Sequence, residues 1–159
     1  MDILGDHEIL LGTYEAFILG YKLADDLTTG NRSLQTSFAN HAHSSTVRSI
    51  AAADKFLVTA GSDENVKIFN LRNRTEHGNL THSDGTLKTM RFYDKRHLVT
   101  GSDDNKICIV KATGSWNVEK TLSKHQGAVT DIAVHPSGKL MLSIGDDNKL
   151  ITWNLIKGR

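Results

Sequence analysis

The segment TAGSDENVKIFN at residues 59–70 decides the fold, because two later segments repeat it. They are TGSDDNKICIVK at residues 100–111 and SIGDDNKLITWN at residues 143–154. Asp63, Asp104 and Asp147 occupy the same place in the three segments and are spaced by 41 and 43 residues. A repeat period of about 40–45 residues is typical of four-stranded β-propeller blades. The sequence therefore predicts a stack of repeated β units.

Each unit also has the pattern of strands that a blade needs, with apolar residues at every second or third position. First strands are expected at 47–50, 87–92 and 129–134, and second strands at 56–59, 97–100 and 140–143. The apolar alternation of the third strands is at Val66/Ile68, Ile107/Ile109 and Leu150/Thr152. Leu80 and the segment 116–122 suit outer fourth strands. No stretch shows a sustained helical period, so we expect an all-β protein.

The N-terminal segment lies before the first complete unit. Residues 10–23 predict a strand, a turn and a second strand, and residues 33–38 suit the outer strand of the same blade. Its innermost strand has no counterpart upstream. This segment therefore predicts one further, partial blade.

One further residue recurs in every unit, a histidine about 20 residues before the turn aspartate, at His43, His82 and His125. With this pattern the chain resembles the WD40 repeat family over roughly residues 41–155. In that family a His, a Ser or Thr, an Asp and a Trp form a hydrogen-bonded network inside each blade. By position the third unit supplies this set in full, as His125, Ser143, Asp147 and Trp153.

The other two units carry the network only in part. The second has His82, Thr100 and Asp104, with Val110 in place of Trp, and the first has His43, Thr59 and Asp63, with Phe69 in that place. None keeps the Trp-Asp dipeptide of the family. Because Phe and Val lack the indole N–H, we expect a weaker network in these two units.

The resemblance implies an incomplete WD40 β-propeller of about three blades plus part of a fourth, spanning residues 1–159. The expected units are a partial N-terminal blade at 9–38, repeats at 41–81 and 82–122, and a repeat at 125–155 that lacks its outer strand. Propellers close with about 4–8 blades. We therefore expect missing blades or another chain to complete the ring.

Composition limits the classes of function. Nineteen basic and 18 acidic side chains give a net charge of +1, which argues against binding nucleic acid mainly by neutralising phosphates. The single Cys108 excludes a disulfide framework. No secretory signal and no apolar run of about 18 residues is present. We expect a soluble, intracellular protein that makes no membrane contact.

Motifs for catalysis or cofactor binding are lacking. We find no phosphate-binding Gly-rich loop, no zinc-type cysteine pair and no nucleophile elbow. The pair His41 and His43 could bind a metal, but a structural His43 beside a solvent-facing His41 is favoured because no further ligand is nearby. Cys108 is interpreted as a small buried hydrophobe. We therefore predict a protein that is not an enzyme, with no catalytic, cofactor-binding or metal-binding residues.

Arg48 and Lys88 are the candidate partner contact. They occupy equivalent positions at the starts of two first strands, where the third unit has Thr130. Two neighbouring cations there could bind an anionic group of a partner. The alternative is that both are solvated residues at the rim of the propeller.

Several stretches outside the repeat pattern, among them 12–15, 40–43, 107–109 and 134–140, are similar to one branch of the WD40 family. That resemblance implies a non-enzymatic nucleolar scaffold in assembly of the large (60S) ribosomal subunit and in pre-rRNA processing. Its implied partners are pre-60S assembly factors, with at most an indirect or weak rRNA contact. It also implies an alternative, negative regulation of p21-activated kinase through the regulatory region of that kinase. The resemblance implies a location in the nucleus or nucleolus. The branch has a Lys-rich tail that this chain does not include, so a cytoplasmic location is the alternative expectation.

Overall fold

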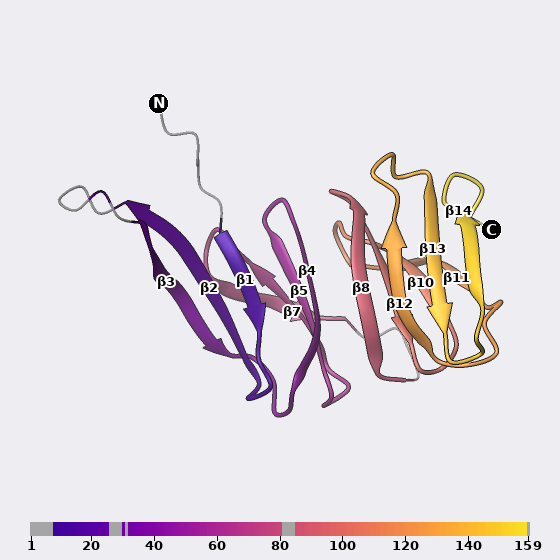
Figure 1. Ribbon diagram of the computed structural model, residues 1–159, viewed down its shortest axis with the longest axis horizontal. Coiled ribbons are helices and arrows are strands. Elements are labelled where there is room, and N and C mark those ends of the chain that lie inside the picture. The colour runs from indigo at the N-terminus through magenta and orange to yellow at the C-terminus, as the bar shows by residue number, and fades with distance from the viewer. Residues whose placement is uncertain (1–7, 26–29, 31, 81–84, 159) are drawn as a thin grey trace.

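The structure is a computed structural model that describes residues 8–25, 30, 32–80 and 85–158. Within these residues all regular elements are β-strands, so none of them forms a helix that could cross a membrane. The strands form four antiparallel sheets that stand side by side in chain order and do not close into a ring (Figure 1). The predicted all-β class and the incomplete propeller are confirmed.

Each sheet takes its strands from one continuous stretch and pairs them in chain order. The bounds are β1 (Glu8–Gly12), β2 (Phe17–Asp25) and β3 (Arg32–His41) in the first sheet; β4 (Val47–Ala53), β5 (Phe56–Gly61), β6 (Val66–Asn70) and β7 (Thr75–Asn79) in the second; β8 (Leu87–Asp94), β9 (His97–Ser102), β10 (Ile107–Lys111) and β11 (Val118–Leu122) in the third; and β12 (Val129–Val134), β13 (Leu140–Gly145) and β14 (Leu150–Asn154) in the fourth.

The strands β4, β8 and β12 begin their sheets and lie against one another along the inner side of the array. The strand β1 corresponds to β5 rather than to β4. In the turn after β1 the N–H of Thr13 donates to the carbonyl of Phe17 (2.9 Å), as the N–H of Gly61 donates to Asn65 (3.1 Å) in the turn after β5. Among the described residues the first sheet therefore lacks an inner strand, and the fourth sheet lacks an outer one.

The turns between second and third strands follow from the aspartates of the repeat. Each aspartate precedes a residue with left-handed backbone, Glu64 (φ 60°), Asn105 (φ 68°) or Asn148 (φ 57°). Asn tolerates this conformation better than most residues. The aspartate then accepts a hydrogen bond from the N–H two residues on, as in an Asx turn. This bond fixes the direction of each carboxylate.

Three outer strands differ from the prediction. Leu80 lies just beyond β7, which ends at Asn79. The strand β3 runs to His41, beyond the expected end at Phe38, because β2 continues opposite it and Phe17 pairs with His41. The strand β11 starts at Val118 rather than at Trp116. Trp116 has a φ of 54°, which a strand cannot contain, and its side chain is buried instead.

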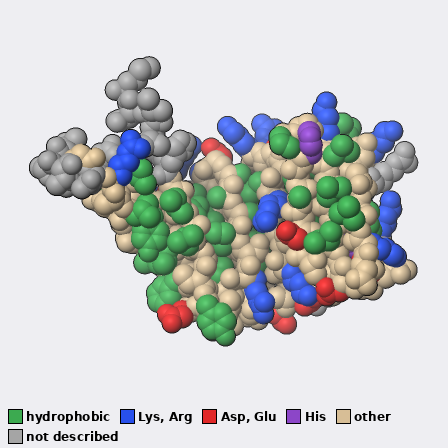
Figure 2. Space-filling view, in the orientation of Figure 1, with side chains coloured by type: hydrophobic (Ala, Val, Ile, Leu, Met, Phe, Trp, Pro, Cys, Tyr) green, Lys and Arg blue, Asp and Glu red, His purple; other side chains and the backbone are tan. Residues whose placement is uncertain are grey.

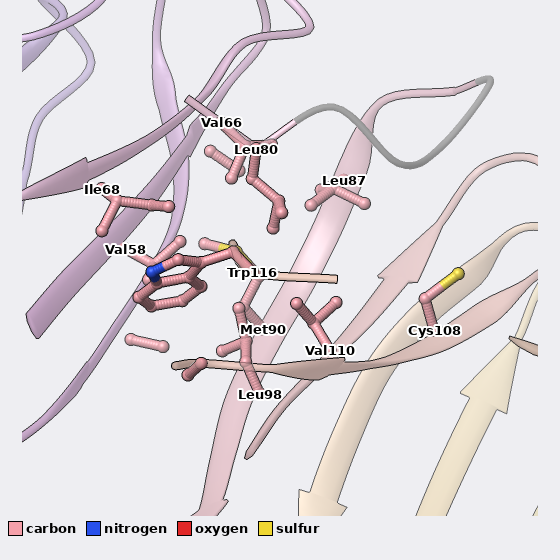
Figure 3. Close-up of a cluster of buried hydrophobic side chains, with 13 residues drawn as sticks. Val58, Val66, Ile68, Leu80, Leu87, Met90, Leu98, Cys108, Val110 and Trp116 are labelled. Carbon is pink, nitrogen blue, oxygen red and sulfur yellow. The ribbon is translucent and has the colours of Figure 1, made fainter. Parts of the chain in front are cut away.

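The core lies between neighbouring sheets rather than inside any one of them. Figure 3 shows the cluster between the second and third sheets, where Val58 and Ile68 face Met90, Leu98 and Val110. A similar cluster joins the third sheet to the fourth, and a smaller one joins the first to the second. Full burial of one such side chain contributes about 1.5–3 kcal/mol, so each sheet depends on its neighbours for stability.

Candidate functional site

In the fourth sheet the structure brings together all four residues that the sequence assigns to the blade network. Nδ1 of His125 lies 3.0 Å from Oδ1 of Asp147, and Nε2 lies 2.7 Å from Oγ of Ser143. Trp153 donates its indole N–H to the same Ser143 oxygen at 2.7 Å. The set is satisfied when His125 is neutral and carries its proton on Nδ1, because Ser143 then donates to Nε2. The strands β13 and β14, the turn between them and the loop before β12 are thereby joined.

The second sheet holds a similar set without the indole. Nδ1 of His43 is 3.0 Å from Oδ1 of Asp63, and Nε2 is 2.8 Å from Oγ1 of Thr59. Phe69 is buried at the position of Trp153 and offers no hydrogen bond. The network here therefore has one member fewer, while the Phe69 ring still fills the space that the indole fills in the fourth sheet.

In the third sheet the set is different. His82 lies outside the described residues. Thr100 is buried and donates to the carbonyl of Cys108 at 3.5 Å. The carboxylate of Asp104 accepts from the hydroxyl of Ser102 and from the N–H of Lys106 at 3.0 Å. The described residues thus hold the turn aspartate through a serine that the other two sheets do not have.

The glycines at the position of Ser102 are residues whose role the sequence reasoning missed. A Cβ on Gly145 would lie 2.8 Å from Nδ1 of His125, and a Cβ on Gly61 would lie 2.5 Å from Nδ1 of His43. Both rings therefore need a residue without a side chain at that place. The repeat pattern indicated this role, since a glycine precedes the turn aspartate by two residues in the first and third repeats.

Backbone N–H groups stabilise the ionised forms of two turn aspartates, Asp63 and Asp147. The N–H of Gln126, at 2.9 Å, is the largest influence on Asp147, and with the His125 ring and the N–H of Lys149 it outweighs burial and lowers the pKa to about 2. Burial raises the pKa of the equivalent Asp63, but N–H donors and its histidine outweigh that effect and lower it to about 2 as well.

These lowered pKa values predict a loss of stability in acid. An unfolded Asp titrates near pH 4, so the folded state gains stability from each carboxylate above about pH 4 and loses it as the pH falls toward 2. Urea unfolding followed by circular dichroism at pH 7, 4 and 3 should show this decline. Replacing Asp63 and Asp147 together by Asn should lower stability at pH 7 and flatten the decline, whereas an unchanged dependence on pH would contradict it.

The described residues form no candidate metal centre. No group of three or more His, Cys, Asp or Glu side chains in this part of the chain could hold a metal ion. His41 ends β3 with its ring against Phe17, at 4.9 Å between ring centroids. Cys108 is buried, and burial raises the pKa of its thiol, which lowers its reactivity.

Arg48, Lys88 and Thr130 lie close together on one surface. Each occupies the extra residue of a β-bulge at the start of an inner strand, β4, β8 or β12. A bulge redirects the side chain of its extra residue, and bulges are frequent next to functional sites. All three side chains line one hollow of about 500 Å³. We call it the bulge hollow.

Neighbouring groups hold the three side chains in place. Nε of Arg48 donates to Oγ of Ser62 at 2.7 Å, and Thr130 donates to the carbonyl of Ile144 at 3.2 Å. Nζ of Lys88 is 3.7 Å from a carboxylate oxygen of Asp146 on the next sheet. The lining is completed by Ser62, Thr86 and Asp103. With two cations, hydroxyl donors and one carboxylate in its lining, the hollow suits a small anionic group.

Comparison with known proteins identifies the repeat. The WD domain, G-beta repeat family matches residues 32–70 and 116–154. A p21-activated protein kinase-interacting protein 1-like protein of Danio rerio is 41% identical over 160 residues, which cover 99% of this chain and 42% of that protein. The human p21-activated protein kinase-interacting protein 1 is 38% identical over 156 residues, 96% of this chain and 40% of its own length.

The fold is also found among solved structures. A chain in the crystal structure of a mitotic checkpoint complex superposes with a TM-score of 0.77 at 18% identity, and the match covers 96% of this chain and 45% of that one. At this identity the likeness concerns the fold alone. The chain spans about two fifths of the length of the curated relatives that it matches.

Proposed function

Because the chain belongs to the WD40 repeat family, we propose that it is a non-enzymatic scaffold in assembly of the large (60S) ribosomal subunit and in pre-rRNA processing. The observation that carries a binding role is the bulge hollow, where three neighbouring sheets each direct one side chain to the same place. The ribosomal assignment rests on the resemblance of the sequence to one branch of the family. This proposal includes action in the nucleus or nucleolus, with the cytoplasm as the alternative location.

We propose that the bulge hollow binds a carboxylate side chain from an acidic segment of a protein partner. The Nε–H of Arg48 is used by Ser62, and a guanidinium has four further N–H donors. Lys88 adds a second charge from the adjacent sheet. The net charge of +1 favours such a local contact over a surface that tracks a phosphate backbone, so any rRNA contact is weak or indirect.

The repeat boundaries given above are part of this proposal. Each sheet is treated as one blade, and the networks of His43 and His125 hold the loops before their sheets in register with the turns after β5 and β13. Their role is structural. They keep the inner strands, and with them the three bulges, at fixed positions.

Depletion of the protein tests the ribosomal role directly. We expect pre-rRNA of the large subunit to accumulate and 60S particles to fall, while small-subunit precursors mature normally. Normal processing of large-subunit rRNA after complete depletion would exclude the proposal. Northern analysis of precursors with sucrose-gradient profiles measures both.

The names of the relatives favour a second candidate function, negative regulation of a p21-activated kinase. In this case the chain binds the regulatory region of the kinase. Purified chain and purified kinase should then form a complex with lowered kinase activity. No complex and no change in activity would exclude this alternative and leave the ribosomal proposal intact.

A further inference from the structure

The turns after β5, β9 and β13 each place one residue near the starts of the inner strands. These residues come directly before the turn aspartates of the repeat and are Ser62, Asp103 and Asp146. The backbone N–H of each donates to the carbonyl just before the inner strand of its own sheet, at 2.8, 3.2 and 2.9 Å. The three residues therefore occupy equivalent positions at the end of the array that holds the bulge hollow.

The two cations of the bulge hollow contact residues of this kind. Arg48 donates to Ser62 of its own sheet, and Lys88 lies 3.7 Å from a carboxylate oxygen of Asp146 on the next sheet. Asp103 stands in both relations at once, because it belongs to the sheet of Lys88 and to the sheet that follows Arg48. It also lines the hollow together with both cations. The repeat therefore places its carboxylate beside both of them.

The turn holds the carboxylate of Asp103 in place. Its Oδ1 packs so close to Gly85 that a Cβ on that glycine would clash with it. The following residue, Asp104, is bonded to the N–H of Lys106, and the next, Asn105, has left-handed backbone. A carboxylate held in this way is a fixed feature of the hollow, to which a ligand has to adapt.

The charges around the bulge hollow cancel. The cations Arg48 and Lys88 are matched by the carboxylates of Asp103 and Asp146. Figure 2 shows Lys or Arg side chains next to Asp or Glu side chains at the end of the array where β12 begins, without a large area of one sign. A ligand that carries only negative charge would be attracted by two groups and repelled by two others. An excess of positive charge therefore does not explain binding here.

We propose that Asp103 determines which acidic segments the bulge hollow accepts, and that it selects those in which a basic side chain adjoins the bound carboxylate. This inference rests on the proposed function of the hollow. The carboxylate of the partner contacts Arg48 and Lys88, while the adjoining Lys or Arg of the partner contacts Asp103. A segment with acidic residues alone leaves Asp103 facing like charge, which acts against the wrong partner.

Two labelled peptides of equal length test this selection by fluorescence anisotropy. One is a hexapeptide of alternating Glu and Lys, the other is a hexapeptide of Glu alone, and both are capped at their ends. The net charge of +1 favours the all-Glu peptide at long range. We expect the opposite order, with the alternating peptide bound at least about threefold more tightly. Asp103→Asn should tighten binding of the all-Glu peptide at least about fivefold and remove this preference.

Asp54→Asn is the matched control, because Asp54 is exposed in the turn at the other end of β4. It should leave both dissociation constants unchanged, and circular dichroism checks that each variant is folded. A wild-type chain that prefers the all-Glu peptide would overturn the inference. So would an Asp103→Asn variant in which the ratio of the two dissociation constants stays the same.

Arg48→Gln combined with Lys88→Gln separates this inference from the proposed function. We expect the combined variant to lose binding of the alternating peptide at least about tenfold. If it binds both peptides like the wild type, or if the wild type binds neither, the hollow is not the contact and both proposals fail. If it loses binding while Asp103→Asn changes nothing, only the selection by Asp103 is wrong.

Discussion

Replacing Trp153 with alanine should lower the free energy of unfolding by about 3–5 kcal/mol. The side chain is 1% exposed and packs in the core between the third and fourth sheets. Its removal leaves a cavity there and takes away the donor that Ser143 accepts from. Trp153→Phe should cost only about 1–2 kcal/mol, since phenylalanine already occupies this position in the second sheet as Phe69 and the loss is limited to the hydrogen bond and part of the ring volume.

Urea unfolding followed by circular dichroism measures both changes. Thr152→Ala is the matched control, because the neighbouring Thr152 is exposed and should change stability by less than about 0.5 kcal/mol. If Phe were as damaging as Ala, the volume of the side chain would not be what matters. If Ala cost less than the loss of one hydrogen bond, Trp153 would not belong to the core.

Gly145→Ala should cost about 2–3 kcal/mol, although it adds only one methyl group. A Cβ at this position would lie 2.8 Å from Nδ1 of His125 and 3.0 Å from Oδ1 of Asp147. The histidine must therefore move away from the aspartate, which breaks the hydrogen bond between them. In a His125→Ala background the ring is absent, so the same substitution should cost less than half as much.

A double-mutant cycle of Gly145→Ala and His125→Ala measures this coupling. We expect an interaction energy of at least about 1 kcal/mol, as is usual for residues in contact. Additive effects would show that Gly145 is needed for a reason other than space for the ring. The carbonyl of Ala128 and Oδ1 of Asp147, each 3.0 Å from the same Cβ, are the remaining obstacles in that case.

The sequence was sufficient for the first three strands of the second, third and fourth sheets and for two of the networks, because both depend on local pattern and on the repeat. His125, Ser143, Asp147 and Trp153 could be named from the resemblance to the WD40 family, carried over by position in the repeat, and the structure places them within hydrogen-bond distance. The position of Trp116 could not be predicted, because its left-handed backbone follows from packing between sheets rather than from its neighbours in sequence.

The candidate site could be predicted only in part. Equivalent positions drew attention to Arg48 and Lys88, but the bulges that direct them into one hollow appear only in the pairing of the strands. The sequence shows that the second repeat has Ser102 where the first and third repeats have Gly61 and Gly145. Its consequence, a hydroxyl bonded to Asp104, depends on how the turn folds.

We propose that this scaffold joins a large-subunit precursor through the bulge hollow. Co-sedimentation with 60S precursor particles tests it most directly, with Arg48→Glu and Lys88→Glu combined in one variant. The exposed pair Lys139→Glu and Lys157→Glu is the control of equal charge. We expect the fraction of hollow variant bound to precursors to fall at least about tenfold while the control binds like the wild type. Equal binding by all three proteins would contradict the claim.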